Sequence, residues 1–345
     1  MRGRGWLVPA LVLGLSGSVA MAEIKREILT YDDLIGWETD DHAAGLAVFA
    51  ETCGDMEGAE WDALCRIART GPPARDFFEM FFLPVRVYDE APTLFTGYFE
   101  PELSGSLEPD ARFRFPLYAV PPDLPEDGPW LTRREIEEGA ALAGRGLEIA
   151  WVDDPVALYF LHVQGSGRVR LPDGSLLRVG YGAANRQPYS SIGAELVARG
   201  LFEPHQVSAD VIANWVRKHP EDGRELLWTN DSFVFFREVN EVPPDRGPLG
   251  AMNRSITALR SIAVDPAYVA LGTPMWVEKD GSGGFQRLMV AQDTGSAIKG
   301  PQRADIFYGT GAAAGRAAGR VRDGGRLIQL LPIQQAYALV EGDGR

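Results

Sequence analysis

Cysteine and histidine are scarce in this sequence, and their scarcity limits the metal chemistry open to it. Two cysteines and four histidines occur in 345 residues, and the histidines lie far apart along the chain. A zinc site needs three or four Cys, His or carboxylate ligands that converge on one point. We therefore expect neither a metal nor an organic cofactor, and the chemistry is left to carboxylates, hydroxyls and amides.

Positive charge is also in short supply. The 34 Lys and Arg residues are outnumbered by 48 Asp and Glu residues, which gives a formal net charge of −14 at pH 7. Nucleic-acid binding depends on clustered Lys and Arg that displace counterions from phosphates. We therefore expect no nucleic-acid partner.

One apolar run stands out, at the N-terminus. Residues 1–22, MRGRGWLVPALVLGLSGSVAMA, place two arginines before the run and an Ala-Met-Ala pattern at its end. This arrangement predicts a secretory signal that is cleaved before Glu23. The alternative is an uncleaved membrane anchor, although the run is short for a spanning helix. No cysteine follows the run, so we expect no lipid attachment there.

The two cysteines belong to segments with helical patterns, residues 41–53 and 58–70. In an oxidising compartment, two nearby cysteines pair more often than they bind a metal. We therefore expect a structural disulfide between Cys53 and Cys65.

Helical patterns open the predicted mature chain and strand patterns dominate the rest of it, so we expect a fold that is mostly β with helices. A capping box at Thr132 and Glu135 predicts the start of one helix. The Pro/Gly-rich segment 241–250 is the best candidate for a domain boundary. Helices are predicted over residues 41–53, 58–70, 132–142, 190–199, 208–219 and 309–320. Strands are predicted over residues 94–106, 113–120, 232–238, 261–266, 273–279, 287–293 and 326–332, with three more inside 157–182.

Two aspartates flank a loop in the segment DTGSAIKGPQRADIFYG, residues 293–309. Asp293 begins a D-T-G turn, in which a short carboxylate accepts backbone N–H bonds and stays ionised. Asp305 precedes an apolar, aromatic run, Ile-Phe-Tyr, which would desolvate the carboxyl and raise its pKa. Asp305 is therefore the better candidate for a general acid, unless both residues merely close turns.

Several further motifs occur in one order between about residue 30 and residue 340. Together they resemble the membrane-bound lytic transglycosylase A family of peptidoglycan-cleaving enzymes, with Asp265, Asp293 and Asp305 as the acids of its three-aspartate (3D) module. The motifs are FTGYFEPELSGS, FLHVQGSGRVRLPDG, VGYGAANRQPYSSIG, NDSFVFFRE, GPLGAMNRSI, AVDP, LGTPMWVE and MVAQDTGSAIKGPQRADIFYGTG.

The resemblance implies a fold of two parts. Residues 23–105 and 236–345 would form a double-psi β-barrel from both chain ends, and residues 106–235 an inserted β-rich, barrel-like, glycan-binding domain. A groove between the two parts would hold the glycan chain of peptidoglycan. Members of the family often carry a lipid anchor, and this sequence lacks the cysteine that would receive it.

The resemblance also implies the reaction. The C6 hydroxyl of N-acetylmuramic acid attacks C1 of its own ring, so the product ends in a 1,6-anhydro sugar and no water is added. Intramolecular attack has a high effective molarity, which makes a separate nucleophile dispensable. One acid can then protonate the leaving oxygen and receive the C6 proton. The family assigns this role to the aspartate before Ile-Phe, which is Asp305 here, with the charge of Asp293 nearby.

Other residues of the matching motifs are candidates for supporting roles. Asp265 precedes a proline, and we expect it to shape a turn rather than to react. Arg186, Arg254 and Arg303 are either ligands of substrate carboxylates or solvated charges. Sugar rings need aromatic faces, and their substituents need amides, hydroxyls or charges. The substrate-binding candidates are Tyr98, Gln164, Asn185, Tyr189, Asn253 and Lys299.

Three other functions remain open at this point. A hydrolase on the same barrel would use Asp293 to activate water, and would leave reducing ends. A non-catalytic peptidoglycan-binding module would need only the aromatic and amide residues. An aspartic protease also carries D-T-G-S but needs two such loops; this chain has one, and a dimer could supply the second.

The expected setting follows from the leader and the resemblance. We expect a monomer in the periplasm of a Gram-negative bacterium, associated with the outer membrane or free of it. Its partners would be peptidoglycan glycan chains and, in addition, scaffold or synthesis proteins of the cell wall.

Overall fold

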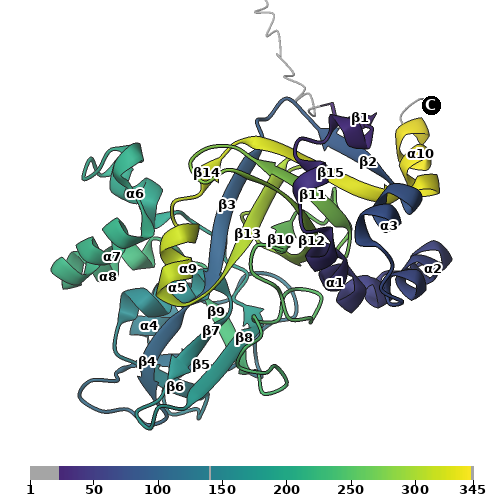
Figure 1. Ribbon diagram of the computed structural model, residues 1–345. Helices are drawn as coiled ribbons and strands as arrows, with labels where there is room; N and C mark the ends of the chain where they lie inside the picture. Colours follow the sequence, from purple (N-terminus) through teal and green to yellow (C-terminus); the bar gives the residue numbers. More distant parts are fainter. Residues whose placement is uncertain (1–22, 140, 343–345) are drawn as a thin grey trace, which may run out of the picture.

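The computed structural model describes residues 23–139 and 141–342, so the leader predicted over residues 1–22 lies outside the described residues. Two β-sheets organise the described part of the chain, and helices pack against both (Figure 1). None of the helices in the described part has the length and apolar character needed to cross a bilayer. The fold class is therefore β-rich with helices, as the sequence predicts.

The larger sheet has nine strands, drawn from both ends of the chain. They are β1 (Lys25–Ile28), β2 (Phe82–Tyr88), β3 (Leu94–Glu100), β10 (Ser261–Val264), β11 (Pro274–Lys279), β12 (Phe285–Thr294), β13 (Arg303–Thr310), β14 (Arg322–Asp323) and β15 (Gly325–Pro332). Their order is β1-β2-β15-β11-β12-β10-β13-β3-β14. Most neighbours are antiparallel, but β10 with β12 and β13 with β3 are parallel.

Side chains from six of these strands meet in one buried cluster, so the sheet must curve around them. The cluster takes Phe95 from β3, Ile262 from β10, Met275 from β11, Met289 from β12 and Ile306 from β13, with β15 adding one leucine. The six strands are consecutive in the sheet order, and Gln302, next to β13, donates to the carbonyls of Val87 in β2 and Leu327 in β15, so the sheet curves back on itself.

The smaller sheet is formed by the middle of the chain. Its strands are β4 (Glu102–Ser106), β5 (Phe115–Tyr118), β6 (Glu148–Val152), β7 (Gly167–Arg170), β8 (Leu176–Ala184) and β9 (Val234–Glu238), in the order β5-β6-β4-β7-β8-β9. The chain changes sheets at Pro101, between β3 and β4. We therefore propose residues 102–238 as the inserted unit, slightly wider at both ends than residues 106–235.

Helices cover both sheets. The larger sheet carries α1 (His42–Thr52), α2 (Ala59–Ala68), α3 (Ala74–Phe81), α9 (Gly311–Ala318) and α10 (Ile333–Glu341). The inserted unit contains α4 (Arg133–Glu138), α5 (Pro155–Gln164), α6 (Ile192–Ala198), α7 (Ala209–Lys218) and α8 (Pro220–Trp228). In Figure 1, α6, α7 and α8 project to one side of the molecule. They share a buried cluster with α5, which connects them to the sheets.

The strand predicted at the start of residues 157–182 is wrong, because this segment is the helix α5. Asp154 caps it by accepting two backbone N–H bonds of the first turn, and Pro155 occupies the first helical position. Gly165, at φ 77°, ends it. The helix is buried on several sides, so its sequence is apolar almost throughout and lacks helical periodicity.

Other elements follow the sequence prediction with changed limits. The capping box of Thr132 and Glu135 is confirmed, but its helix ends at Glu138 rather than near residue 142. The strand predicted over 94–106 is two strands, one in each sheet, because the chain turns at Pro101. The sequence patterns missed α3, α8 and α10.

The predicted disulfide between Cys53 and Cys65 is confirmed. Both cysteines lie in the cluster that joins α1, α2 and α3 to the larger sheet. The bond spans 12 residues of sequence and ties the end of α1 to α2.

We predict that the double variant Cys53→Ala/Cys65→Ala loses about 3 kcal/mol of unfolding free energy, because a cross-link over a loop of this length restricts the unfolded chain. Urea unfolding under oxidising conditions measures the loss. Dithiothreitol should bring the wild type to the same value and leave the variant unchanged. Equal stability of the two oxidised proteins would contradict this role of the disulfide.

Candidate active site

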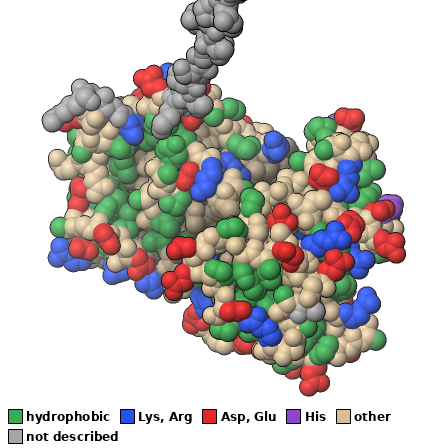
Figure 2. Space-filling model, turned by 180° about the vertical axis from the view of Figure 1, so that it is seen from behind, with side chains coloured by type: hydrophobic (Ala, Val, Ile, Leu, Met, Phe, Trp, Pro, Cys, Tyr) green, Lys and Arg blue, Asp and Glu red, His purple; other side chains and the backbone are tan. Residues whose placement is uncertain are grey.

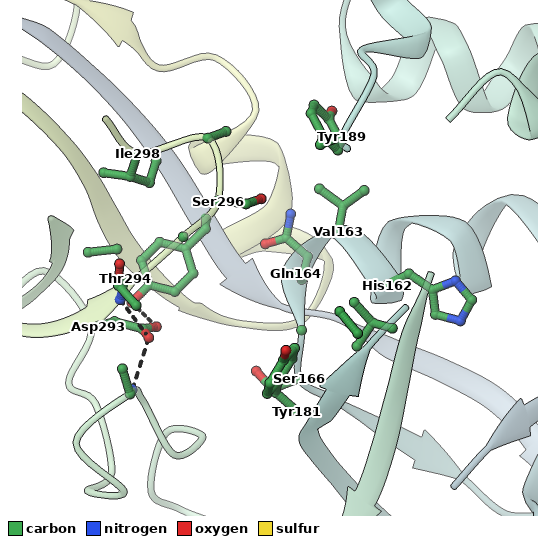
Figure 3. A pocket seen from close by; sticks show the side chains of 18 of the residues that line it. His162, Val163, Gln164, Ser166, Tyr181, Tyr189, Asp293, Thr294, Ser296 and Ile298 are labelled. Carbon is green, nitrogen blue, oxygen red and sulfur yellow. Dashed lines mark hydrogen bonds between the residues drawn. The ribbon is translucent and has the colours of Figure 1, made fainter. Parts of the chain in front are cut away.

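A groove of about 950 Å³ lies between the two sheets. One wall comes from β3, β10, β12 and β13 of the larger sheet, and the other from the end of α5 and from β8 and β9 of the inserted unit. Figure 3 shows Asp293 on the first wall, across the groove from Gln164 and Tyr181 on the second. Among the sequence candidates, Asp305, Tyr98, Tyr189, Asn253 and Lys299 also line this groove.

The strand register places the two aspartates on either side of one small residue. Ala263 in the middle strand β10 pairs with Asp293 in β12 and with Asp305 in β13. Residues paired across neighbouring strands point to the same face, and two strand spacings separate the Cα atoms by roughly 10 Å. Both carboxyls therefore face the groove, and Ala263 leaves the space between them open.

A β-bulge in β12 produces this register. Ile262 pairs with Ala291 while the next residue, Ala263, pairs with Asp293, so Gln292 is an extra residue in β12. Without the bulge, Asp293 would pair with Val264 and point into the core of the sheet, because side chains alternate along a strand. The bulge thus turns Asp293 toward the groove.

Asp293 is held by three hydrogen bonds. Its Oδ1 accepts the N–H groups of Ala251 (3.0 Å) and Thr294 (2.9 Å), and its Oδ2 accepts the Tyr98 hydroxyl (2.9 Å), as the dashed lines in Figure 3 show. Burial nevertheless raises the pKa of Asp293 to about 6, and the charge of Asp305 adds to the rise. Desolvation thus outweighs the three donors, but a pKa of about 6 still leaves Asp293 mostly ionised at pH 7.

Asp305 has fewer hydrogen-bond partners. Its Oδ1 accepts the Thr96 hydroxyl (2.6 Å), and Arg303 donates to the Thr96 oxygen (2.8 Å), which directs the hydroxyl proton toward Asp305. Burial raises the pKa of Asp305, whereas the Thr96 hydrogen bond and the Arg303 charge lower it. Within residues 23–139 and 141–342, the other carboxyl oxygen has no hydrogen-bond partner and Asp305 forms no ion pair. That oxygen is free to exchange a proton.

Thr96 is the residue that sequence reasoning missed at this carboxyl. It lies in β3 and pairs with Asp305 in the parallel β3–β13 ladder. The motif FTGYFEP contains it, but only the pairing of β3 with β13 identifies its partner.

Tyr98 has a different contact from the one expected. Its hydroxyl binds Asp293, its ring packs at 5.3 Å from that of Phe307, and burial raises its pKa well above the ordinary tyrosine value. Tyr98 therefore remains a hydrogen-bond donor to Asp293. Gln164 accepts the backbone N–H of Phe99 (3.0 Å) through its oxygen. Its amide nitrogen makes no hydrogen bond within the described part of the chain.

Asp265 is buried beneath the loop that joins β12 and β13. Its carboxylate accepts the backbone N–H groups of Gly300 (2.9 Å) and Ala267 (3.2 Å), and Lys299 lies 3.7 Å from it. The groove lining does not include Asp265. These contacts favour the structural role, since they hold the loop between the two groove aspartates.

Asn185 departs from the sequence expectation of sugar contact. Its side chain is fully buried, donates to the carbonyls of Leu131 and Asp231, and accepts the N–H groups of Phe233 and Gln187. All of its hydrogen-bonding groups are occupied, so its role is structural. An aromatic residue that the sequence reasoning did not single out, Tyr181 of β8, lies exposed in the groove instead.

Two family models match the chain. The "MltA specific insert domain" matches residues 94–237, and the "3D domain" matches residues 260–331. The Membrane-bound lytic murein transglycosylase A of Vibrio cholerae is 36% identical over 343 residues, which cover 95% of this chain and 82% of the relative.

Solved structures agree with this similarity. The membrane-bound lytic murein transglycosylase of Agrobacterium tumefaciens superposes with a TM-score of 0.78 at 34% identity, covering 91% of this chain and 99% of the other. The structure of E. coli MltA with bound chitohexaose superposes with a TM-score of 0.71 at 28% identity, covering 87% and 90%. The two-sheet fold is thus shared with enzymes of known structure.

The raised pKa of Asp293 predicts a pH-dependent effect of Asp293→Asn on stability. The folded protein holds the proton more tightly than the unfolded chain, whose carboxyl has a pKa near 3.8. The stability associated with this group is therefore present below pH 4 and lost as pH rises through about 6. Asparagine does not titrate and so avoids this loss. The unfolding free energy of the variant should therefore rise relative to that of the wild type by about 1–2 kcal/mol between pH 4 and pH 7, allowing for partial exposure.

Urea unfolding of both proteins across this pH range provides the measurement. Asp127→Asn, at an exposed position outside the groove, is the matched control and should not show the trend. A difference between wild type and Asp293→Asn that does not change with pH would contradict the assigned protonation.

Proposed function

Because the chain belongs to the family of membrane-bound lytic murein transglycosylases A, we propose that its groove cleaves the glycan chains of peptidoglycan through the carboxyl of Asp305. The protein is a lytic murein transglycosylase of the bacterial cell envelope, a lyase that acts on peptidoglycan. The observation that carries the proposal for Asp305 is the row of Asp293, Ala263 and Asp305 across the groove wall.

Asp305 begins the reaction as the acid. Its carboxyl proton passes to the glycosidic oxygen as the bond from C1 of N-acetylmuramic acid to the N-acetylglucosamine oxygen breaks. The C6 hydroxyl of the same muramic acid forms a new bond to C1, and its proton returns to Asp305. Asp305 therefore ends the cycle protonated, as it began, and the product carries a 1,6-anhydro end.

Asp293 supports this cycle through its charge. Two carboxyls on one wall titrate as a coupled pair, so an ionised Asp293 favours the proton on Asp305. A negative charge beside the groove also stabilises the positive charge that develops at C1. The three hydrogen bonds of Asp293 suit this fixed role, because they leave its oxygens less free for proton transfer.

The glycan chain would contact polar and aromatic side chains that line the groove. Tyr189 offers an aromatic face that is 42% exposed, and Gln164 offers an amide nitrogen. Asn253 and Lys299 line the opposite side of the groove. Tyr98 would act through Asp293 rather than by stacking on a sugar.

We place the enzyme in the periplasm. The disulfide between Cys53 and Cys65 supports this location, since disulfides persist in oxidising compartments. Membrane attachment, a monomeric state and recruitment by wall-synthesis proteins stay predictions.

We predict that Asp305→Asn lowers the turnover of purified sacculi by at least about 10³-fold, because asparagine has no proton to deliver. The protein should still sediment with sacculi, and wild-type digests should contain 1,6-anhydro ends by mass spectrometry. Arg254→Gln is the control, because Arg254 pairs with Asp55 and does not line the groove. Retained turnover would remove Asp305 from the role, and reducing ends would identify hydrolysis instead.

Thr96→Val tests the partner of this acid. The Thr96 hydrogen bond lowers the pKa of Asp305, so its removal should raise that pKa and move the alkaline limb of the pH–rate profile upward. We expect this limb to move to higher pH and kcat to fall roughly tenfold, as one hydrogen bond to a charged group is lost. Thr96→Ser, which keeps the hydroxyl, should restore the wild-type profile. An unchanged profile in Thr96→Val would show that Thr96 does not set the protonation of Asp305.

A further inference from the structure

Arg186 has an unusual backbone conformation in the wall of the groove. It follows β8 and adopts φ 56°, in the left-handed region that non-glycine residues rarely occupy. Its side chain is exposed and lines the groove. Backbone strain of this kind costs of order 1–3 kcal/mol and persists only where neighbouring structure enforces it.

The neighbours of Arg186 enforce the conformation. Asn185 is fixed by its four side-chain hydrogen bonds, and Gln187 donates through its amide nitrogen to the carbonyl of Trp130 (2.6 Å). The guanidinium of Arg186 donates to the carbonyl of Pro125 through one Nη. The motif AANRQ thus builds a rigid support that presents Arg186 to the groove.

The groove is basic although the protein is acidic. Among the described residues, five basic side chains line it and two acidic ones do. On the outer face in Figure 2, by contrast, acidic and basic side chains are interspersed. The basic lining residues are Arg133, Arg186, Arg237, Lys299 and Arg303, and the acidic ones are Asp293 and Asp305.

Most of these basic groups already have a partner. Arg133 pairs with Glu137, Arg237 with Glu241 and Lys299 with Asp265. The half-buried Arg303 donates instead to two backbone carbonyls and to the Thr96 hydroxyl oxygen. Arg186 has no acidic partner among residues 23–139 and 141–342. Among the basic groups of the described groove lining, Arg186 thus combines exposure with the lack of an acidic partner, so its charge is available to an anionic group of a ligand.

Tyr181 lies close to this charge. Its ring is 56% exposed in the groove, on β8 just before the Arg186 loop. Burial of its hydroxyl raises the pKa of Tyr181, and the positive charge of Arg186 opposes the rise. An exposed aromatic ring beside an unpaired guanidinium suits a sugar that carries a carboxylate on a substituent.

We propose that Arg186 binds a substrate carboxylate while the sugar packs on Tyr181, and so favours muramic acid units over uncharged sugars. The proposal rests on the proposed function and names the part of the substrate that this wall recognises. Two sources of the carboxylate exist in peptidoglycan, the peptide stem and the lactyl group that is exposed when the stem is removed. A planar guanidinium with free N–H groups pairs with either one.

The test compares wild type, Arg186→Gln and Arg186→Lys on chemically matched glycan chains. The first sample keeps its peptides. The second has lost its peptides to an amidase and carries free lactyl groups. A portion of each sample is amidated, by coupling its carboxyls to methylamine with a carbodiimide. The rate at which soluble fragments are released gives kcat and KM for each protein on each glycan sample. Arg254→Gln is the matched arginine control, and thermal melting checks that every variant is folded.

We expect Arg186→Gln to raise KM about tenfold with little change in kcat on at least one charged sample, as the loss of one charge-assisted hydrogen bond predicts. Wild type and variant should be equal on the amidated portion of that sample, and Arg186→Lys should fall between them. An effect confined to peptide-bearing chains identifies the stem, and one confined to amidase-treated chains identifies the lactyl group.

An equal rise in KM on charged and amidated chains would overturn the proposal, because the effect of Arg186 would then not depend on a substrate carboxylate. No loss on either charged sample would overturn it as well. Failure of the proposed function looks different, because wild type itself would then release no 1,6-anhydro ends from any sample.

Discussion

The chemistry of this protein depends on one extra residue in a β-strand. The bulge at Gln292 brings Asp293 into register with Ala263, and Ala263 is already in register with Asp305. Both carboxyls then face one groove, where burial raises the pKa of each. Bulges of this kind are common next to active sites because they redirect a side chain without changing the rest of the sheet.

The two walls of the groove divide the work between them. The larger sheet supplies the titrating groups, while the inserted unit supplies exposed groups for the glycan chain. Buried Glu100, at the end of β3, helps to hold the walls together: its carboxylate contacts Arg168 and Arg178 of the inserted unit and accepts the hydroxyl of Thr310 from the larger sheet. An ion cluster at the point where the chain changes sheets fixes the orientation of one wall against the other.

The sequence predicts the parts of this site that depend on local chemistry. Asp305 is recognisable by the apolar residues after it. The disulfide is recognisable because a predicted secretory leader precedes two cysteines on neighbouring helical segments. The environment of Asp293 is not predictable in this way, because a D-T-G turn is typical of a solvated loop. The bulge that turns Asp293 toward the groove and the contact with Tyr98 depend on the fold. Asn185 was misassigned for a related reason: its amide fits sugar chemistry, and only the fold shows that backbone groups occupy it. Residues 157–164 were misassigned because a buried helix has no polar face.

The central claim is that Asp293 and Asp305 form a coupled pair of carboxyls with raised pKa values. Carbon-13 NMR titration of aspartate-labelled protein, with Asp293→Asn and Asp305→Asn for assignment, measures this directly. The account predicts that Asp293 titrates near pH 6, that Asp305 titrates above the ordinary aspartate value of about 3.9, and that removing Asp305 lowers the pKa of Asp293. Two carboxyls that titrate independently in the ordinary range would contradict it.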